Sequence, residues 1–344
     1  MKTKTLFLIC FFCQLSLIKA QDPHFTMYKF QPMYQNPALT GSFSGDLRVN
    51  LNHRQQWATV SEPYTTSHFS VDGCVRRTET AQFCIGAFII DDRAGASDFR
   101  QLQPSLNMSA AIRVGEKSSI AAGIGAGVFS QSIHSGDLMW ASQYNGMNYD
   151  PALSSGESIE GLSSTKFDVH AGMAFKFQTE STNMSSNDGV KGEFGISAFH
   201  LNQPQQVTLL TEDSKHVRLA AHAEMSIGIE ATNSSVEPSF VVLLQGTQKE
   251  FLPGISFRQV IREESKYTHF VKKSALTLGC QLRTKDAVNI LTFFELNNMA
   301  IGFSYDINIS DFSKATNGTG AFEFAIRYMI IGKTAGGTRN APIF

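Results

Sequence analysis

Apolar and polar side chains alternate along much of the chain. Residues 167–177 show this most clearly, because every odd position is apolar, while Asp168, His170 and Lys176 lie between them. The same period of two recurs in residues 217–229 and 322–330. Successive side chains of a β-strand point to opposite faces, so this period predicts strands with one apolar and one polar face.

Fourteen such segments follow one another along the chain. They are expected near residues 45–55, 63–72, 82–91, 98–114, 118–130, 164–178, 191–202, 215–229, 236–246, 250–260, 274–284, 287–296, 299–309 and 320–331. The clearest of them exceed the usual 5 or 6 residues of a soluble strand and reach the roughly 9 to 11 that cross a bilayer. An even number of such strands predicts an all-β fold, a closed antiparallel transmembrane β-barrel. A soluble two-sheet sandwich or a propeller is the alternative, disfavoured by strand length and by the lack of a fixed repeat.

One predicted strand has an unusually small second face. In residues 118–129, the isoleucines and Val128 share one face, and the other face carries Ala121, Gly123, Gly125 and Gly127. Glycine in a strand often marks a place where another backbone approaches closely. We therefore expect something to approach this face from inside the barrel.

The first twenty residues predict an export signal. Lys2 and Lys4 precede an apolar run from Leu6 to Leu17, and Ala20 ends a plausible cleavage site. Removal of residues 1–20 takes three lysines from 29 basic side chains and leaves 26 against 30 acidic ones. This balance gives no indication of a nucleic-acid partner.

Three cysteines remain after residue 20, namely Cys74, Cys84 and Cys280. So few cysteines in an exported chain of this length do not form a disulfide framework. Cys74 and Cys84 could form one bridge across a turn. They could equally be two unlinked small residues near strand ends, because sequence does not fix the separation of their Cβ atoms.

The segment before the first predicted strand, residues 21–44, has neither the period of a strand nor that of a helix. We call it the N-terminal strip. We expect it either to plug the barrel, packing near the glycines of residues 123–127, or to serve as a periplasmic or partner-binding segment. Its candidate contact residues are Phe25, Tyr28, Phe30, Tyr34, Asn36 and Pro37.

Two connections between predicted strands carry further candidates for partner contact. The longest connection, residues 131–163, holds Trp140, Tyr144 and Tyr149 and a turn at Asp150-Pro151, which predicts an ordered structure. Its aromatic side chains could anchor the barrel at the membrane interface or form a docking surface. The second candidate is the turn formed by Asn202, Gln203 and Pro204.

Several longer motifs resemble the PorP/SprF family. They are QDPHFTMYKFQPMYQNPALTGS from residue 21, HRQQW at 53–57, DDRAG at 91–95, QYNGMNYDPALSSGE at 143–157, AFHLNQPQQ at 198–206 and IGFSYDINISDFSKATNGTGAFEFAIRY at 301–328. That family comprises outer-membrane proteins of the type IX secretion system of Bacteroidetes, which serve protein secretion and gliding motility. The chain departs from the family at its end, where Asn340-Ala341-Pro342-Ile343-Phe344 stands in place of a Cys-Pro-Arg-Phe terminus.

The resemblance implies a barrel of the cell outer membrane that binds secretion components, or that receives and anchors the C-terminal domain of a large secreted adhesin. It implies no enzyme, cofactor or metal, and the scattered histidines lack the spacing of a metal site. A passive or solute-specific porin is the alternative. The domains expected are a signal peptide at 1–20, the strip at 21–44, the barrel at 45–331 and a tail at 332–344.

Overall fold

The computed structural model describes most of the chain after the expected signal peptide. The described residues are 22–59, 62–95, 99–133, 139–156, 163–179, 189–206, 213–263, 273–311 and 313–331. The expected signal peptide at 1–20 and the tail at 332–344, with its unusual terminus, therefore lie outside the described residues.

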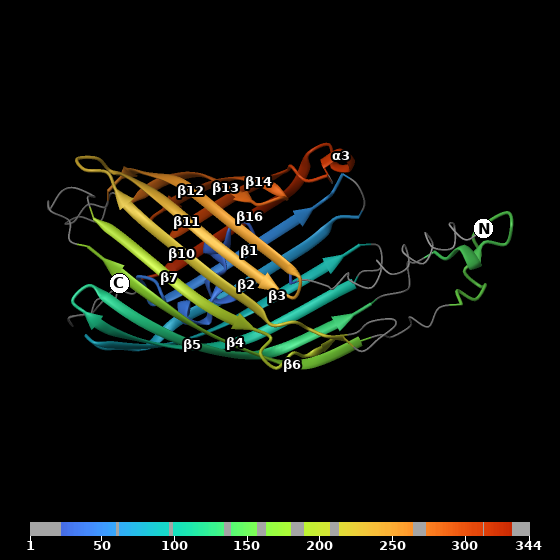
Figure 1. Cartoon of the computed structure of the whole chain (residues 1–344), viewed down its shortest axis with the longest axis horizontal. Coiled ribbons are helices and arrows are strands. Elements are labelled where there is room, and N and C mark those ends of the chain that lie inside the picture. Colours follow the sequence, from blue (N-terminus) through green and yellow to red (C-terminus); the bar gives the residue numbers. More distant parts are fainter. Residues whose placement is uncertain are drawn as a thin grey trace, which may run out of the picture.

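Fourteen antiparallel strands form a closed barrel (Figure 1). They are β1 (Leu47–Gln56), β2 (Tyr64–Arg77), β3 (Ala81–Ala94), β4 (Phe99–Gly115), β5 (Ser118–Ser132), β6 (Ser163–Gln178), β7 (Val190–Phe199), β10 (Arg218–Gly228), β11 (Ser234–Gln245), β12 (Gln248–Arg262), β13 (Ser274–Arg283), β14 (Ala287–Leu296), β15 (Met299–Asn308) and β16 (Thr319–Ile330). The ring closes between β1 and β16, from Leu47 opposite Ile330 to Gln56 opposite Ala321. The predicted fold class is confirmed.

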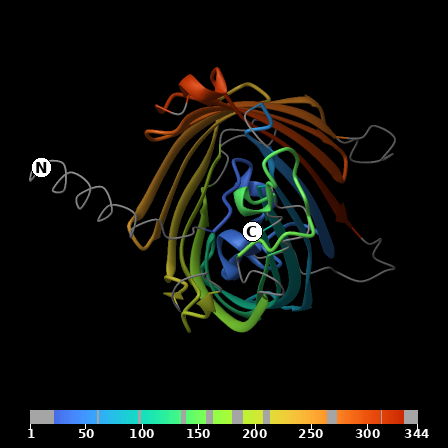
Figure 2. The same ribbon diagram turned by 90° about the vertical axis from the view of Figure 1, so that its right-hand side faces the viewer.

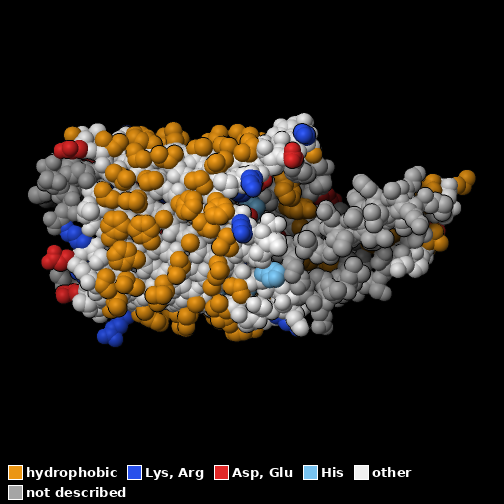
Figure 3. Space-filling model, viewed as in Figure 1, with side chains coloured by type: hydrophobic (Ala, Val, Ile, Leu, Met, Phe, Trp, Pro, Cys, Tyr) orange, Lys and Arg blue, Asp and Glu red, His pale blue; other side chains and the backbone are white. Residues whose placement is uncertain are grey.

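Alternation along the strands places apolar side chains outside and polar ones inside. On β1, Leu51 is exposed on the outer surface, whereas Asn50, Asn52 and Arg54 are buried in the lumen. Apolar side chains cover the side of the barrel in Figure 3, and charged side chains gather toward its ends. A lipid-facing apolar band with a polar interior is the arrangement of a membrane barrel. None of the helices in the described part of the chain is long and apolar enough to cross a membrane.

The two ends of the barrel carry different connections. One end, which we call the turn end, holds the start of β1, the end of β16, the tight β2–β3 and β4–β5 turns and the longer β6–β7 and β12–β13 connections. The opposite end, the loop end, holds the long β5–β6 connection with the 3-10 helix η4 (Ala141–Gln143), and the short helix α3 (Ser313–Thr316). The loop end also holds a two-stranded sheet of β8 (Gln205–Gln206) and β9 (Asp213–Ser214). The alternation of the sequence did not predict β8, β9 or α3, because two to four residues are too few to repeat a pattern.

The N-terminal strip lies inside the barrel. It forms three short helical turns, η2 (Tyr28–Phe30), α2 (Pro32–Gln35) and η3 (Pro37–Leu39). Figure 2 faces the loop end and shows these turns in blue within the ring of strands. Asn36 separates the last two turns, where its side chain accepts a hydrogen bond from the Ala38 amide and Pro37 begins the next turn.

Candidate partner-binding surfaces

The strip begins at a buried carboxylate near the loop end. The Asp22 carboxylate lies 2.5 Å from Lys215 Nζ and 2.7 Å from His200 Nε2. His200 also reaches Asp168 of β6 through Nδ1, at 2.9 Å. Burial by itself raises the pKa of the Asp22 carboxyl, but the charges of His200, Lys215 and Arg218 outweigh it and hold that pKa well below its ordinary value. Asp22 is therefore charged and ties the strip to the wall.

A second group of buried charges holds the strip at Thr26. The Glu323 carboxylate of β16 accepts hydrogen bonds from the Thr26 and Met27 amides, at 2.7 and 3.0 Å. Arg54 of β1 donates to Thr26 Oγ1 at 2.8 Å and lies 2.7 Å from Asp306 Oδ2. All of these side chains are buried, so each charge depends on its partner to offset the loss of water.

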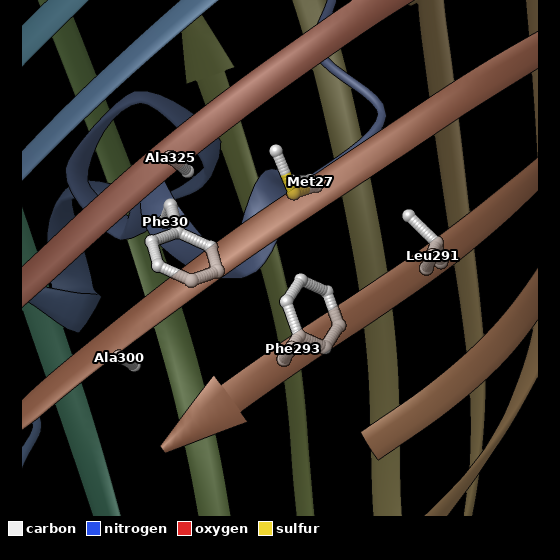
Figure 4. Packing of buried hydrophobic residues seen from close by; sticks show 6 residues of the cluster. All are labelled: Met27, Phe30, Leu291, Phe293, Ala300 and Ala325. Atoms are coloured by element: carbon white, nitrogen blue, oxygen red, sulfur yellow. The ribbon is translucent and has the colours of Figure 1, made fainter. Parts of the chain in front are cut away.

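Apolar side chains of the strip pack against several parts of the wall. Met27 and Phe30 lie against Leu291, Phe293, Ala300 and Ala325 of β14, β15 and β16 (Figure 4). On other sides of the lumen, the strip packs on β3, on β4 to β6, and on β11 and β12. Those contacts join Phe25, Met33 and Tyr34 to Phe88 and Ile90, Ala38 and Leu39 to Ala111, Ala121 and Ala174, and Tyr28 to Val241 and Leu252. The strip thus touches the wall around most of its circumference.

The Asn36-Pro37 turn lies against the small face of β5 and its neighbours. Asn36 Nδ2 donates to the carbonyl oxygens of Met173 and Ile196, at 2.9 and 3.2 Å. A Cβ on Gly123 would collide with the backbone of Pro37 and Ala38, so this position requires glycine. The close approach expected from the glycines of residues 118–129 is what the structure shows.

The strip leaves the lumen beside a disulfide bond. Cys74 and Cys84 lie opposite each other on β2 and β3 and are joined in the structure. Gly41 packs directly on this bridge with φ at +70°, a backbone conformation that favours glycine. The Gly41 amide donates to Asp72, and Arg48 donates to the same carboxylate and to the Leu39 carbonyl. The strip is therefore fixed at both of its ends.

The long β5–β6 connection forms an ordered loop at the loop end, which we call the 139–156 loop. Gln143 accepts from the Trp140 amide at 3.2 Å and from the Tyr149 hydroxyl at 3.3 Å, and it donates to the Leu153 carbonyl at 3.1 Å. Tyr144 and Tyr149 form a β-bridge with each other. These bonds shape the loop while leaving apolar side chains in solvent, as Tyr144 is 57% exposed and Met147 is 84% exposed.

The structure separates the candidate residues into two groups. Phe25, Tyr28, Phe30, Tyr34, Asn36 and Pro37 are all buried in the lumen. Trp140, Tyr144, Tyr149, Asp150, Asn202, Gln203 and Pro204 lie at the loop end, where Pro204 is buried and the others are at least partly exposed. A partner that approaches the barrel from this end meets the second group first.

Sequence reasoning did not find the charges that hold the strip. Asp22 and His200 are 178 residues apart, and Thr26 and Asp306 are 280 residues apart. One feature of the sequence did indicate such contacts: charged side chains occupy the polar face of strands that are predicted to span the membrane. Such side chains face the lumen and need partners there.

The chain matches one family model and is similar to several solved structures. A family described as "Type IX secretion system membrane protein PorP/SprF" matches residues 17–328. No curated protein matches the chain significantly. Similar solved structures include the CymD monoaromatic hydrocarbon channel, at 12% identity over 88% of this chain and 93% of that chain, with a TM-score of 0.45. They also include the P. putida toluene transporter TodX, at 9% identity over 87% and 93% of the two chains, with a TM-score of 0.47. Because the family match extends over nearly the whole barrel, the chain belongs to the PorP/SprF family of type IX secretion system membrane proteins.

Proposed function

We propose that this protein is an outer-membrane component of type IX protein secretion and gliding motility. In this role it binds the secretion machinery, or it receives and anchors a secreted surface adhesin. The family match over residues 17–328 carries the proposal. The closed barrel supports the outer membrane as its location, because closed barrels are the β-structures that span a membrane without an unpaired edge in lipid.

The strip acts as a plug in this proposal. A passive porin requires a water-filled lumen. Here the strip packs on β3, on β4 to β6, on β11 and β12, and on β14 to β16. These contacts favour a binding role over conduction. A partner that used Phe25 or Tyr34 would first have to displace the strip, because the wall covers both side chains.

The loop end is the surface that we assign to partner contact. Outer-membrane barrels have short turns on the periplasmic side and longer loops outside. By this rule the 139–156 loop faces the exterior, in front of the lumen in Figure 2. Hydrogen bonds within the loop already fix its shape, so little conformational entropy is lost when its exposed apolar side chains bind a partner. Tyr144 and Met147 have this character.

The test is affinity purification of the tagged, full-length protein from gently solubilised outer membranes, with quantitative identification of co-purified proteins. We expect type IX components or a large surface adhesin in near-stoichiometric amounts. A protein that is purified alone, folded and in high yield contradicts the proposal and favours the porin alternative.

A loop variant localises the contact. The double substitution Tyr144→Ser and Met147→Ser removes two exposed apolar side chains, and we expect it to lower partner recovery about tenfold, since each 1.4 kcal/mol of binding free energy is a factor of ten. Val114→Ser, which changes an exposed side chain near the turn end, serves as the matched control. Equal recovery from both variants would move the contact away from the 139–156 loop.

A further inference from the structure

Strand β6 extends beyond its neighbour β7 toward the loop end. It pairs with β5 from Ser163 to Phe177, whereas its pairing with β7 covers only Ala171 to Gln178. One edge of β6 therefore continues past the end of the β7 ladder. We use the name β6 edge for the part of this edge from Ser163 to Phe167. We use the name seam for the point at which pairing between β6 and β7 ends.

The backbone turns away from β6 directly after the end of β7. β7 ends at Phe199, and His200 and Gln203 adopt φ values of +58° and +45°, which are uncommon for residues other than glycine. His200 is held there by Asp168 of β6 and Asp22 of the strip. The departure from the ladder is thus fixed by buried contacts, and backbone in this conformation is common at functional sites.

Beyond the end of β7, the Asn202 side chain bonds the backbone of β6 in place of a further β7 residue. Its Oδ1 accepts from the Val169 amide at 3.1 Å, and its Nδ2 donates to the Phe167 carbonyl at 2.6 Å. The Leu201 amide donates to the Val169 carbonyl at 3.0 Å. In antiparallel pairing, alternate residues direct both peptide groups to the same side. The peptide groups of Phe167, Thr165 and Ser163 therefore point to the same side of β6 as those of Val169. No described strand pairs with Thr165 or Ser163 on that side.

The β6 edge lies where a water-borne chain can reach it. The outward apolar side chains of β6 run from Phe167 to Phe177, about the length of a membrane crossing. Ser163 and Thr165 lie beyond this stretch and are exposed, and Phe167 is 60% exposed at its limit. Exposed strand edges with free peptide groups are templates for another strand.

We infer that the β6 edge binds an extended strand of the exported protein, an inference that rests on the proposed function. The edge offers peptide groups at the repeat of a strand, and an extended backbone complements that repeat, as in β-augmentation. A lipid headgroup has no such repeat. Next to the edge, Phe167 and Leu201 favour an apolar side chain on the outer face, and exposed Lys166 favours an acidic one on the inner face.

Proline at position 165 tests this contact with little change to the barrel. Thr165 directs its amide to the open edge, so Thr165→Pro removes a free donor and leaves the bonds to β5 in place. Thr165→Val is the matched control, because both variants lose the hydroxyl contact with Ser130 and only one loses the amide. We expect Thr165→Pro to recover at least about tenfold less of the exported protein than Thr165→Val, at equal yield of folded barrel. Equal recovery from both overturns the inference.

Amide hydrogen exchange provides a second measurement that does not depend on a variant. In the full-length barrel in lipid nanodiscs, the Thr165 and Phe167 amides should exchange fast. In the purified complex with the exported protein, they should slow at least about tenfold. Slow exchange in the isolated barrel would show that the edge is already covered, and unchanged exchange in the complex would show that the partner binds elsewhere. Either outcome overturns the inference while leaving the proposed function standing. Purification of the wild-type protein alone would instead contradict the proposed function.

Discussion

Buried charges hold the strip in several regions of the lumen, and the wall behind the strip differs between two of them. At Thr26 the partners Arg54 and Glu323 belong to β1 and β16, which pair without interruption over the whole length of β1. At Asp22 the partner His200 follows the end of β7, at the seam, and the partner Lys215 lies in the same connection, shortly before β10. The same kind of contact thus joins the strip to a continuous wall in one region and to an interrupted wall in the other.

This difference teaches that one barrel can combine a continuously paired wall with a wall in which pairing between two strands stops short. Removing one member of a buried ion pair leaves an uncompensated charge, so both regions are sensitive to substitution. At the seam the charges of Asp22 and Asp168 also hold His200, where the chain leaves the β6 ladder. We therefore expect substitutions near Thr26 to act on folding, and substitutions near Asp22 to act mainly on the seam.

The largest effect is expected from Glu323→Ala. This change leaves the Thr26 and Met27 amides without their acceptor, and Arg54 keeps only Asp306, a carboxylate that it shares with Arg283. The buried positive charge is then incompletely compensated, at a cost of about 3–5 kcal/mol. The measurement is the temperature at which the heat-modifiable folded form is lost on a semi-native gel. Phe322→Leu, on the outer face of the same strand, is the control and should behave as wild type. A Glu323→Ala barrel as stable as this control would show that the continuous wall does not depend on its charges.

A smaller effect is expected from Asp22→Ala, about 1.5–3 kcal/mol, typical of hydrogen bonds to a charged group. The freed His200 and Lys215 lie outside the long strands, so they can rehydrate more easily than Arg54. The readout is amide exchange of residues 22–27 relative to residues 37–43 in the same barrel. A loss of stability as large as that of Glu323→Ala would remove the difference between the two regions.

Gly123→Ala tests the contact between the strip and the small face of β5. The added methyl group collides with the backbone of Pro37 and Ala38, and overpacking of this kind costs about 1–3 kcal/mol. We expect faster amide exchange in residues 36–40, measured as for Asp22→Ala. Ala122→Val adds more volume on the outer face of the same strand and should leave that exchange unchanged. Equal effects from the two variants would argue against tight packing of the turn.

The smallest effect is expected from a change of pH, which acts on stability through the Asp22 carboxyl. Its folded-state pKa lies below the unfolded value of roughly 3.9, so its stabilisation is fully present above that value and is lost as pH falls through the folded-state pKa. The stability difference between wild type and Asp22→Asn should therefore shrink as pH falls below about 4. A difference that already shrinks between pH 8 and 6 would mean that the carboxyl titrates in the neutral range.

The sequence was sufficient to predict the barrel because each strand repeats one simple alternation. Each of the fourteen expected segments overlaps one strand of the barrel. The segment expected at 191–202 was too long, because β7 ends at Phe199, where His200 turns the chain away from β6. The glycines of residues 118–129 also predicted a close approach from inside, and Gly123 shows it.

The contacts of the strip could not be predicted in the same way. Their specificity depends on which polar side chains meet across the lumen, and residues such as Asp22 and His200 are far apart in sequence. The β6 edge could not be predicted from the alternation either. Alternation indicates which face of the sheet a side chain occupies, but it does not indicate where the pairing of two strands ends. Asn202 was singled out as part of a turn, but its bonds to β6 follow only from the register.

The most direct test of the central claim, that the strip seals a barrel built for binding, is single-channel recording of the purified full-length protein in planar bilayers. Deletion of residues 22–40 provides the comparison. We expect no steady conductance for the full-length protein and a measurable conductance for the deletion variant, provided that the latter remains heat-modifiable. Steady, porin-like conductance of the full-length protein would contradict the central claim.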